Sequence, residues 1–244
     1  MQTKQTGFDL ERASRGDHPQ RVHDRLGAPK DCPVVGTRPS PLSPECWEQA
    51  QRGERQFWLN YLNANSDGDQ QWLRYVLAYF CLSDGQGCDG ETLVDIGSGP
   101  IGILTRLTGH RRIAVDPLGV ESLDKSIERI KAPGEDTALP SDLADRVFIY
   151  NVLQHVFAPE SVLHEAVRVL RPMGRIYLLE QLYFPTDREH PHSLTIDMFD
   201  RWYHDYRFKV LKYSFELDKR LSSVNNDAPN SGYAVLCLIL QKCA

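Results

Sequence analysis

A glycine-rich turn between an apolar segment and a predicted helix is the part of the sequence best suited to bind a ligand. The segment, residues 93–102, is LVDIGSGPIG. Gly97 and Gly99 allow a tight turn and close approach of a ligand to the backbone, and Gly102 allows a helix to pack closely on a strand. Asp116 follows Gly97 by nineteen residues, where a carboxylate can accept hydrogen bonds from both ribose hydroxyls of a nucleotide. The turn therefore predicts a nucleotide-binding loop.

The spacing of this loop fits a dinucleotide, but other features of the sequence argue against that ligand. A G-x-G-x-x-G turn followed by an acidic residue about 20 positions later is the dinucleotide fingerprint, so an NAD-dependent oxidoreductase is one hypothesis. Asp95 argues against it, because a carboxylate two residues before Gly97 would repel a pyrophosphate and attract the ammonium group of an amino acid. The loop also begins more than ninety residues into the chain, which leaves too little sequence after it for a separate substrate domain.

Composition limits the classes of protein to consider. The 244 residues fit one large domain or two small ones, and the net charge of −5 argues against nucleic acid as a partner. Hydrophobic residues at 41% and charged residues at 25% are typical of a globular protein. No apolar stretch of about 18 residues predicts a membrane span, and the first residues lack the apolar core of a secretory signal. The six cysteines form no C-x-x-C pair, so we expect reduced thiols, no metal site and a cytoplasmic protein.

The N-terminal third differs in character from the rest of the chain. Residues 1–44 contain six of the 15 prolines and no apolar period, which predicts a flexible arm. Residues 45–84 predict two aromatic-rich helices, the first capped by Ser43 and started by Pro44. These helices either pack on the core or form a lid over a ligand cleft. The remaining residues, 85–244, are expected to form the catalytic domain.

Strands and helices alternate beyond this cover. We expect a loop at 84–91, strands at 92–96, 112–115, 129–132, 147–150 and 175–182, and helices at 100–108, 118–126, 160–170 and near 199–206. Pro172 and Gly174 are expected to end the third of these helices. Two final strands, 208–217 with a phase slip near Leu211 and 233–240, flank a polar loop at 218–231 and suggest an antiparallel hairpin. The pattern predicts an α/β fold with a doubly wound, mostly parallel, seven-stranded Rossmann-like sheet whose last strand is antiparallel.

Five sequence pieces in order make this region resemble the class I S-adenosylmethionine-dependent methyltransferases. They are VDIGSG at 94–99, AVDP at 114–117, GEDTALP at 134–140, YNVLQHV at 150–156 and RVLRPMGR at 168–175. Each piece alone is weak, but their order and spacing over about 90 residues are specific. The sequence departs from the family in a short spacer at 141–145, in Arg146 where an apolar residue is common, and in Met173 where a glycine is frequent.

The resemblance implies S-adenosylmethionine as cofactor and a role for eight residues. These are Asp95, Gly97, Ser98, Gly99, Asp116, Glu135, Asp136 and Asn151. The glycine turn would pass beneath the methionine part of the cofactor, with Asp95 organising that end. Asp116 would hold the ribose, and Glu135 or Asp136 would lie near the adenine amino group. Asn151 would face the cleft near the cofactor.

The residues that would serve the reaction follow the fourth and fifth strands. Methyl transfer from a sulfonium is an in-line displacement that gains much from alignment, but an oxygen or nitrogen acceptor can also need a base. His155 is the candidate base, unless it only caps or packs its loop. Glu180 ends a strand where ligands of open α/β sheets bind, although a solvated strand end would look the same. Tyr183, His190 and His192 are expected to line the acceptor pocket, with core packing or a helix start as the alternatives.

These observations predict transfer of a methyl group to an oxygen or nitrogen atom of a small-molecule metabolite or natural product. An NAD-dependent oxidoreductase and a non-catalytic nucleotide-binding module stay as alternatives. The sequence predicts neither the identity of the acceptor nor the oligomeric state.

Overall fold

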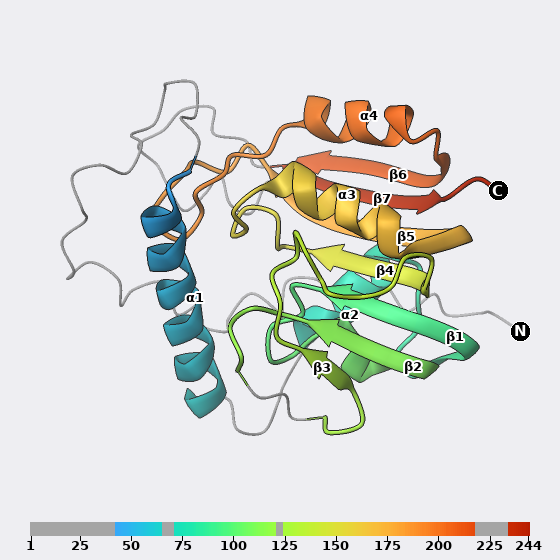
Figure 1. Cartoon of the computed structure of the whole chain (residues 1–244), viewed down its shortest axis with the longest axis horizontal. Helices are drawn as coiled ribbons and strands as arrows, with labels where there is room; N and C mark the ends of the chain where they lie inside the picture. Colours follow the sequence, from blue (N-terminus) through green and yellow to red (C-terminus); the bar gives the residue numbers. More distant parts are fainter. Residues whose placement is uncertain (1–41, 65–70, 121–123, 218–233) are drawn as a thin grey trace, which may run out of the picture. The chain divides into compact units, whose positions relative to one another are not determined.

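A single seven-stranded sheet forms the centre of the computed structural model, which describes residues 42–64, 71–120, 124–217 and 234–244. The strand order is β3-β2-β1-β4-β5-β7-β6 (Figure 1). The strands are β1 (Gln86–Ile96), β2 (Leu107–Val115), β3 (Glu128–Ile130), β4 (Ala144–Tyr150), β5 (Leu170–Leu182), β6 (Lys209–Leu217) and β7 (Ala234–Gln241). β1 to β5 are parallel, and β7 is antiparallel to both β5 and β6. The predicted sheet, with its antiparallel last strand, is confirmed.

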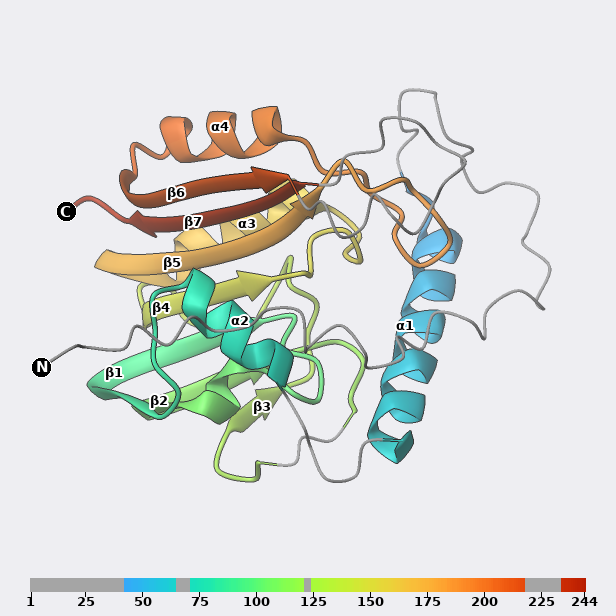
Figure 2. The ribbon, with the colours of Figure 1, turned by 180° about the vertical axis from the view of Figure 1, so that it is seen from behind.

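Helices cover both faces of the sheet. α3 (Pro159–Val169) and α4 (Ile196–Asp205) lie on one face, and α2 (Gln71–Tyr79) lies on the other with the short 3-10 helix η2 (Ile103–Arg106) (Figures 1 and 2). α1 (Pro44–Ala64) crosses the end of the sheet at which the parallel strands finish (Figure 1). Its start is as predicted, because the Oγ of Ser43 accepts a hydrogen bond from the amide of Cys46 at 3.2 Å.

Two apolar clusters lie on opposite sides of the sheet. Alternate residues of a strand point to opposite faces, so Val94 and Ile96 of β1 join the cluster beneath α3 and α4, whereas Leu93 joins the cluster beneath α2. All three side chains are fully buried. Asp95 shares the face of Leu93, and a carboxylate is thereby placed at the end of a core strand, next to the glycine turn.

The predicted helix at 100–108 is wrong, and the physical reason is the length of the connection. Leu107 pairs with Gln86 at the start of β1, so the residues between Ile96 and Leu107 must carry the chain back along the whole strand. An α-helix advances only about 1.5 Å per residue and could not cover that distance. The chain forms the four-residue η2 instead and enters β2 at once.

Three other predicted boundaries are also wrong. Of the expected loop at 84–91, only residues 84 and 85 form a turn; residues 86–91 are the first half of β1, whose register shifts between Cys88 and Thr92. The expected helix at 118–126 is absent, since its described residues, 118–120 and 124–126, contain only turns and irregular chain. Pro172 and Gly174 lie inside β5, because α3 ends at Val169 and the strand begins at the next residue.

The phase slip near Leu211 is confirmed as an irregularity in the ladder. The register between β6 and β7 shifts between Val210 and Lys212, which is the two-against-one pairing of a β-bulge. Most of the predicted arm, residues 1–41, and the predicted polar loop at 218–231 lie outside the described residues. None of the described helices is both long enough and apolar enough to cross a membrane.

Candidate functional site

The glycine turn lies at the carboxyl end of β1, between α1 and the chain that follows β4. Gly97 has φ +74° and Gly99 has φ +55°, which L side chains rarely adopt. A Cβ on Gly97 would lie 2.4 Å from Cγ1 of Val152, and a Cβ on Gly99 would lie 3.3 Å from the indole of Trp58. The positive φ angles therefore favour glycine at both positions, and at Gly97 the contact with Val152 also leaves no room for a side chain.

Asp95 is a buried carboxylate beneath this turn. Neither oxygen makes a hydrogen bond of good geometry with the described residues, although the amide of Ile103 lies close enough to favour the charged form. Burial raises the pKa of Asp95 well above its ordinary value. A Cβ on Gly102 would lie 2.4 Å from Oδ2 of Asp95, so the glycine makes room for the carboxylate. An unpaired buried carboxylate is costly, and a cationic or hydrogen-bond-donating ligand group would satisfy it.

Asp116 ends β2 and is tied to the glycine turn. Its Oδ2 accepts a hydrogen bond from the amide of Gly99, and its Oδ1 accepts one from the amide of Leu118, each at 2.8 Å. Burial raises the pKa of Asp116, while these bonds and the nearby Arg129 oppose the rise. A carboxylate has about four acceptor positions, so both oxygens can still accept from a sugar hydroxyl.

Arg129 of β3 is a site residue that sequence reasoning missed. Its Nη2 donates to the carbonyl oxygen of Gly99 at 2.8 Å, and its charge favours the ionised forms of Asp95 and Asp116. The available signal was an arginine in an expected core strand, where a cation needs acidic partners. The guanidinium therefore holds the turn and offsets part of the negative charge around it.

Glu135 and Asp136 lie on the connection from β3 to β4. Oε1 of Glu135 accepts hydrogen bonds from the amides of Phe157 and Ala158 at 2.8 and 2.9 Å, just before the first turn of α3. The carboxylate of Asp136 is exposed, and its Oδ1 lies 3.4 Å from the amide of Ala138. The two acidic residues are thus neighbours in space, but Glu135 already has a structural partner.

His155 lies in the loop after β4, where α1 covers it. Its Nδ1 lies 2.9 Å from the carbonyl oxygen of Glu189 and 3.7 Å from Oε2 of Glu54. The carbonyl can only accept, so Nδ1 carries the proton and Nε2 keeps its lone pair. Burial, followed by the charge of His190, lowers the pKa of His155 to about 4. The imidazole is therefore neutral at physiological pH.

Of the other two predicted histidines, His190 lies against His155, and His192 is bonded to the backbone next to it. The rings of His190 and His155 are 4.7 Å apart, and Nδ1 of His190 lies 2.9 Å from Oδ1 of Asp187. Nε2 of His192 lies 2.8 Å from the carbonyl oxygen of Val156, and burial lowers its pKa. Asp187 was not predicted, although a turn can bring an Asp side chain to a His that follows it by three residues.

Glu180 and Asn151 sit at the ends of β5 and β4. Glu180 is fully buried, and its Oε1 accepts hydrogen bonds from the amides of Val152 and Leu153 at 3.0 and 3.1 Å. Its Oε2 has no partner among the described residues, and burial raises its pKa to about 8. Asn151 has φ +52° and an exposed side chain that accepts from Gln154 at 3.1 Å. Glu180 thus supports the loop that packs on Gly97.

Tyr183 lies farther along, towards β6. Its φ is +60°, its ring is 41% exposed, and its amide donates to the carbonyl oxygen of Leu194 at 2.9 Å. Tyr213 of β6 is close enough to interact with it electrostatically. The structure therefore brings His155 and His190 together, holds His192 on the backbone of Val156, and places Tyr183 beside another strand.

A hollow of about 260 Å³ lies between α1 and the chain after Asp116. Its lining residues are Trp47, Glu48, Gln51, Arg52, Arg55, Pro117 and Leu118. α1 also reaches the loop after β4, where Nε2 of Gln51 donates to the carbonyl oxygen of His155 at 2.7 Å. Within the part of the chain that the structure describes, no three His, Cys, Asp or Glu side chains are grouped to hold a metal ion.

Part of the chain matches a known protein family. Residues 94–178 match the model of a methyltransferase domain. No curated protein sequence matches the chain significantly.

Solved structures share the fold at low sequence identity. A SAM-dependent methyltransferase from Leishmania major is 15% identical, with 81% of this chain and 85% of that chain covered and a TM-score of 0.54. A SAM-dependent methyltransferase from Thermotoga maritima is 17% identical, with coverages of 79% and 98% and a TM-score of 0.51. A phosphoethanolamine N-methyltransferase from Haemonchus contortus, solved with S-adenosylhomocysteine, is 12% identical, with coverages of 72% and 53% and a TM-score of 0.52. Residues 94–178 therefore match a methyltransferase domain, and the described part of the chain shares the fold of S-adenosylmethionine-dependent methyltransferases.

Proposed function

We propose that the protein binds S-adenosylmethionine and transfers its methyl group to an oxygen or nitrogen atom of a small-molecule metabolite or natural product. The observation that carries the proposal is the buried carboxylate of Asp95, which lacks a partner of good geometry among the described residues. The ammonium group of a methionine moiety would satisfy this carboxylate, whereas the pyrophosphate of NAD would be repelled. The site thus favours the proposed cofactor over a dinucleotide.

The other predicted cofactor residues fit the same ligand. Gly97, Ser98 and Gly99 would face the methionine part, and Asp116 would accept hydrogen bonds from the ribose. Glu135 and Asp136 offer acceptors for an adenine amino group, and the exposed Asn151 would face the cleft. When bound, the cofactor supplies an electrophilic methyl group on a sulfonium.

The three predicted histidines would serve the acceptor. We propose His155 as the group that takes the acceptor's proton, because its neutral ring keeps a lone pair on Nε2. His190 and His192 would line the acceptor pocket, and the held ring of His190 would orient the acceptor. Glu180 and Tyr183 complete the proposed substrate-binding set, Glu180 through the loop that it supports.

The proposal extends to the organisation of the chain. Residues 1–44 would form the arm, residues 45–84 the cover or lid, and residues 85–244 the methyltransferase domain. Contacts of α1 with the glycine turn and with His155 support a lid. The net charge of −5 supports a small-molecule acceptor rather than nucleic acid. We propose a cytoplasmic location, as expected for cysteines that form no C-x-x-C pair.

Calorimetry with S-adenosylhomocysteine and with NAD tests the cofactor. We expect the first ligand to bind and the second not to bind. Asp95→Asn should weaken S-adenosylhomocysteine binding, because the amide loses the negative charge that faces the ammonium group. Asp89→Asn, which alters an exposed residue of the same strand, is the matched control. Binding of NAD instead would refute the proposal, and turnover of labelled S-adenosylmethionine with a metabolite extract would separate an enzyme from a binding module.

A further inference from the structure

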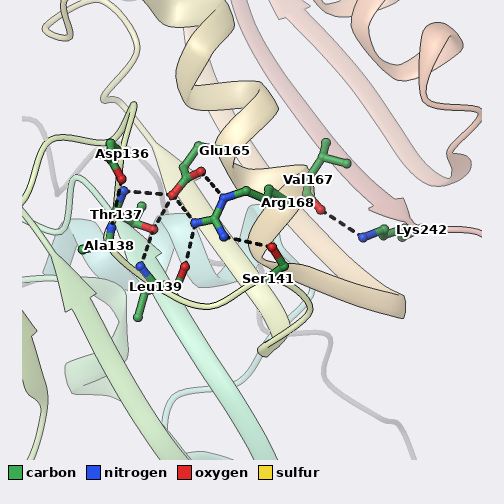
Figure 3. A network of polar contacts seen from close by, with 9 residues as sticks. All are labelled: Asp136, Thr137, Ala138, Leu139, Ser141, Glu165, Val167, Arg168 and Lys242. Atoms are coloured by element: carbon green, nitrogen blue, oxygen red, sulfur yellow. Dashed lines mark hydrogen bonds and ion pairs between the residues drawn. The ribbon is translucent and has the colours of Figure 1, made fainter.

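A polar network joins α3 to the connection that carries Glu135 and Asp136 (Figure 3). At its centre is the buried side chain of Glu165. Oε1 of Glu165 accepts hydrogen bonds from the amide and the hydroxyl group of Thr137, at 2.9 and 2.5 Å. Nε of Arg168 donates to Oε2 of Glu165 at 2.6 Å, and its Nη2 donates to Oε1 at 2.7 Å. The guanidinium group of Arg168 and the carboxylate of Glu165 thus form a bidentate ion pair.

Arg168 extends this contact along the connection. Its Nη2 also donates to the carbonyl oxygen of Leu139 at 2.7 Å, and its Nη1 donates to Oγ of Ser141 at 3.1 Å. The carbonyl oxygen of Arg168 accepts from the amide of Asp142 at 3.0 Å. Residues 137–142, which we call the clamped loop, are therefore bonded to α3 along their whole length.

The backbone of the clamped loop would not keep this shape by itself. Ala138 has φ +57° and Asp142 has φ +56°, and few residues other than glycine adopt such left-handed angles. Outside bonds are therefore needed to hold both residues in place. The two residues just before the loop, Glu135 and Asp136, are positioned from the same side, because Glu135 is bonded to the start of α3.

We infer that Glu165 and Arg168 are positioning residues for cofactor binding: they touch no cofactor, but they fix the loop that presents Glu135 and Asp136 to the adenine ring. The inference rests on the proposed function. Arg168 also lies close enough to Asp136 to be influenced by its charge, so it offsets the repulsion that a third carboxylate, Glu165, would add. Although burial favours the neutral acid, the bonds from Arg168 and Thr137 lower the pKa of Glu165. The pair therefore stays ionised at physiological pH.

Calorimetry with S-adenosylhomocysteine and S-inosylhomocysteine tests this role, because the second ligand lacks the adenine amino group. The variants are Glu165→Gln, Arg168→Lys and Thr137→Val, and the matched control is Glu160→Gln, an exposed residue on the same helix. We expect the first two variants to bind S-adenosylhomocysteine about tenfold more weakly than wild type. Their preference for the adenine ligand should also shrink, since a displaced loop cannot reach the amino group. Thr137→Val removes the hydroxyl bond to Glu165 and the bond from the amide of Leu139, but it keeps the ion pair. It should have a smaller effect in the same direction, and the control should match wild type.

The preference for adenine separates positioning from plain stability. Variants that melt earlier but keep the wild-type affinity and preference, measured below their melting temperatures, would overturn the inference. If Glu165→Gln fails to fold, the other two variants test the inference by the same measurements. Arg168→Lys keeps the positive charge, and Thr137→Val keeps the carboxylate of Glu165. Failure of the wild type to bind S-adenosylhomocysteine would overturn both this inference and the proposed function. Wild-type binding with unchanged variants would overturn the inference alone.

Discussion

Glu180 gives a prediction about stability whose size follows from the structure. Burial raises the pKa of its carboxyl group from 4.5 to about 8. The folded protein therefore holds this proton up to about pH 8, whereas the unfolded chain releases it near pH 4.5. Its contribution to the free energy of unfolding is fully present below pH 4.5 and is lost as pH rises to 8. The two pKa values correspond to a loss of about 5 kcal/mol, at about 1.36 kcal/mol per pKa unit.

Glu180→Gln isolates this contribution. The amide oxygen can still accept from Val152 and Leu153, and the NH₂ group replaces the protonated oxygen. We expect the variant to match wild type at about pH 5 and to exceed its stability at about pH 8.5, by up to about 5 kcal/mol. Urea unfolding over this pH range measures the difference in the free energy of unfolding between the variant and wild type. The contributions of the other titrating groups cancel in that difference. A difference that does not change with pH would refute the reasoning.

Four further predictions concern the site. Asp116→Ala should weaken S-adenosylhomocysteine binding by about 1.5–3 kcal/mol in calorimetry, because charge-assisted hydrogen bonds to the ribose are lost; unchanged affinity would contradict the assignment. Gly99→Val should abolish binding while circular dichroism stays near wild type, since its Cβ would approach Trp58 at a positive φ. His155→Ala should lower turnover by about 10²–10⁴ with nearly intact cofactor affinity, once an acceptor is known; full turnover with an unchanged pH profile would place the base elsewhere. α1 should be cleaved faster by proteases without S-adenosylhomocysteine than with it, and equal rates would count against a lid.

Much of the fold follows from local patterns in the sequence. The apolar stripe of α3, the cap at Ser43 and the phase slip near Leu211 depend on residues only a few positions apart. Each of them has a local physical cause that a sequence shows directly: helical period, hydrogen-bonding side chain or strand alternation. These features were therefore predicted correctly.

The errors come from constraints that act over long distances. The segment after Gly99 has helix-compatible apolar spacing, and only the pairing of Gln86 with Leu107 excludes a helix there. The site shows the same limit. Glu54 reaches His155 across a hundred residues, and no spacing in the sequence relates α1 to the loop after β4. The candidate site residues could thus be proposed from their types and positions, but their partners could not.

The short η2 sets the electrostatic character of the glycine turn. In phosphate-binding folds a long α-helix begins at such a turn, and its N-terminal end carries about half a positive charge. Here a single 3-10 turn begins six residues after Gly97, so hardly any aligned peptide dipoles point at the ligand. The ionisable groups around the turn include Asp95, Asp116, Glu54 and Arg129, and burial raises the pKa of the three carboxyl groups. The turn therefore lacks the aligned helix dipole that holds a diphosphate in those folds.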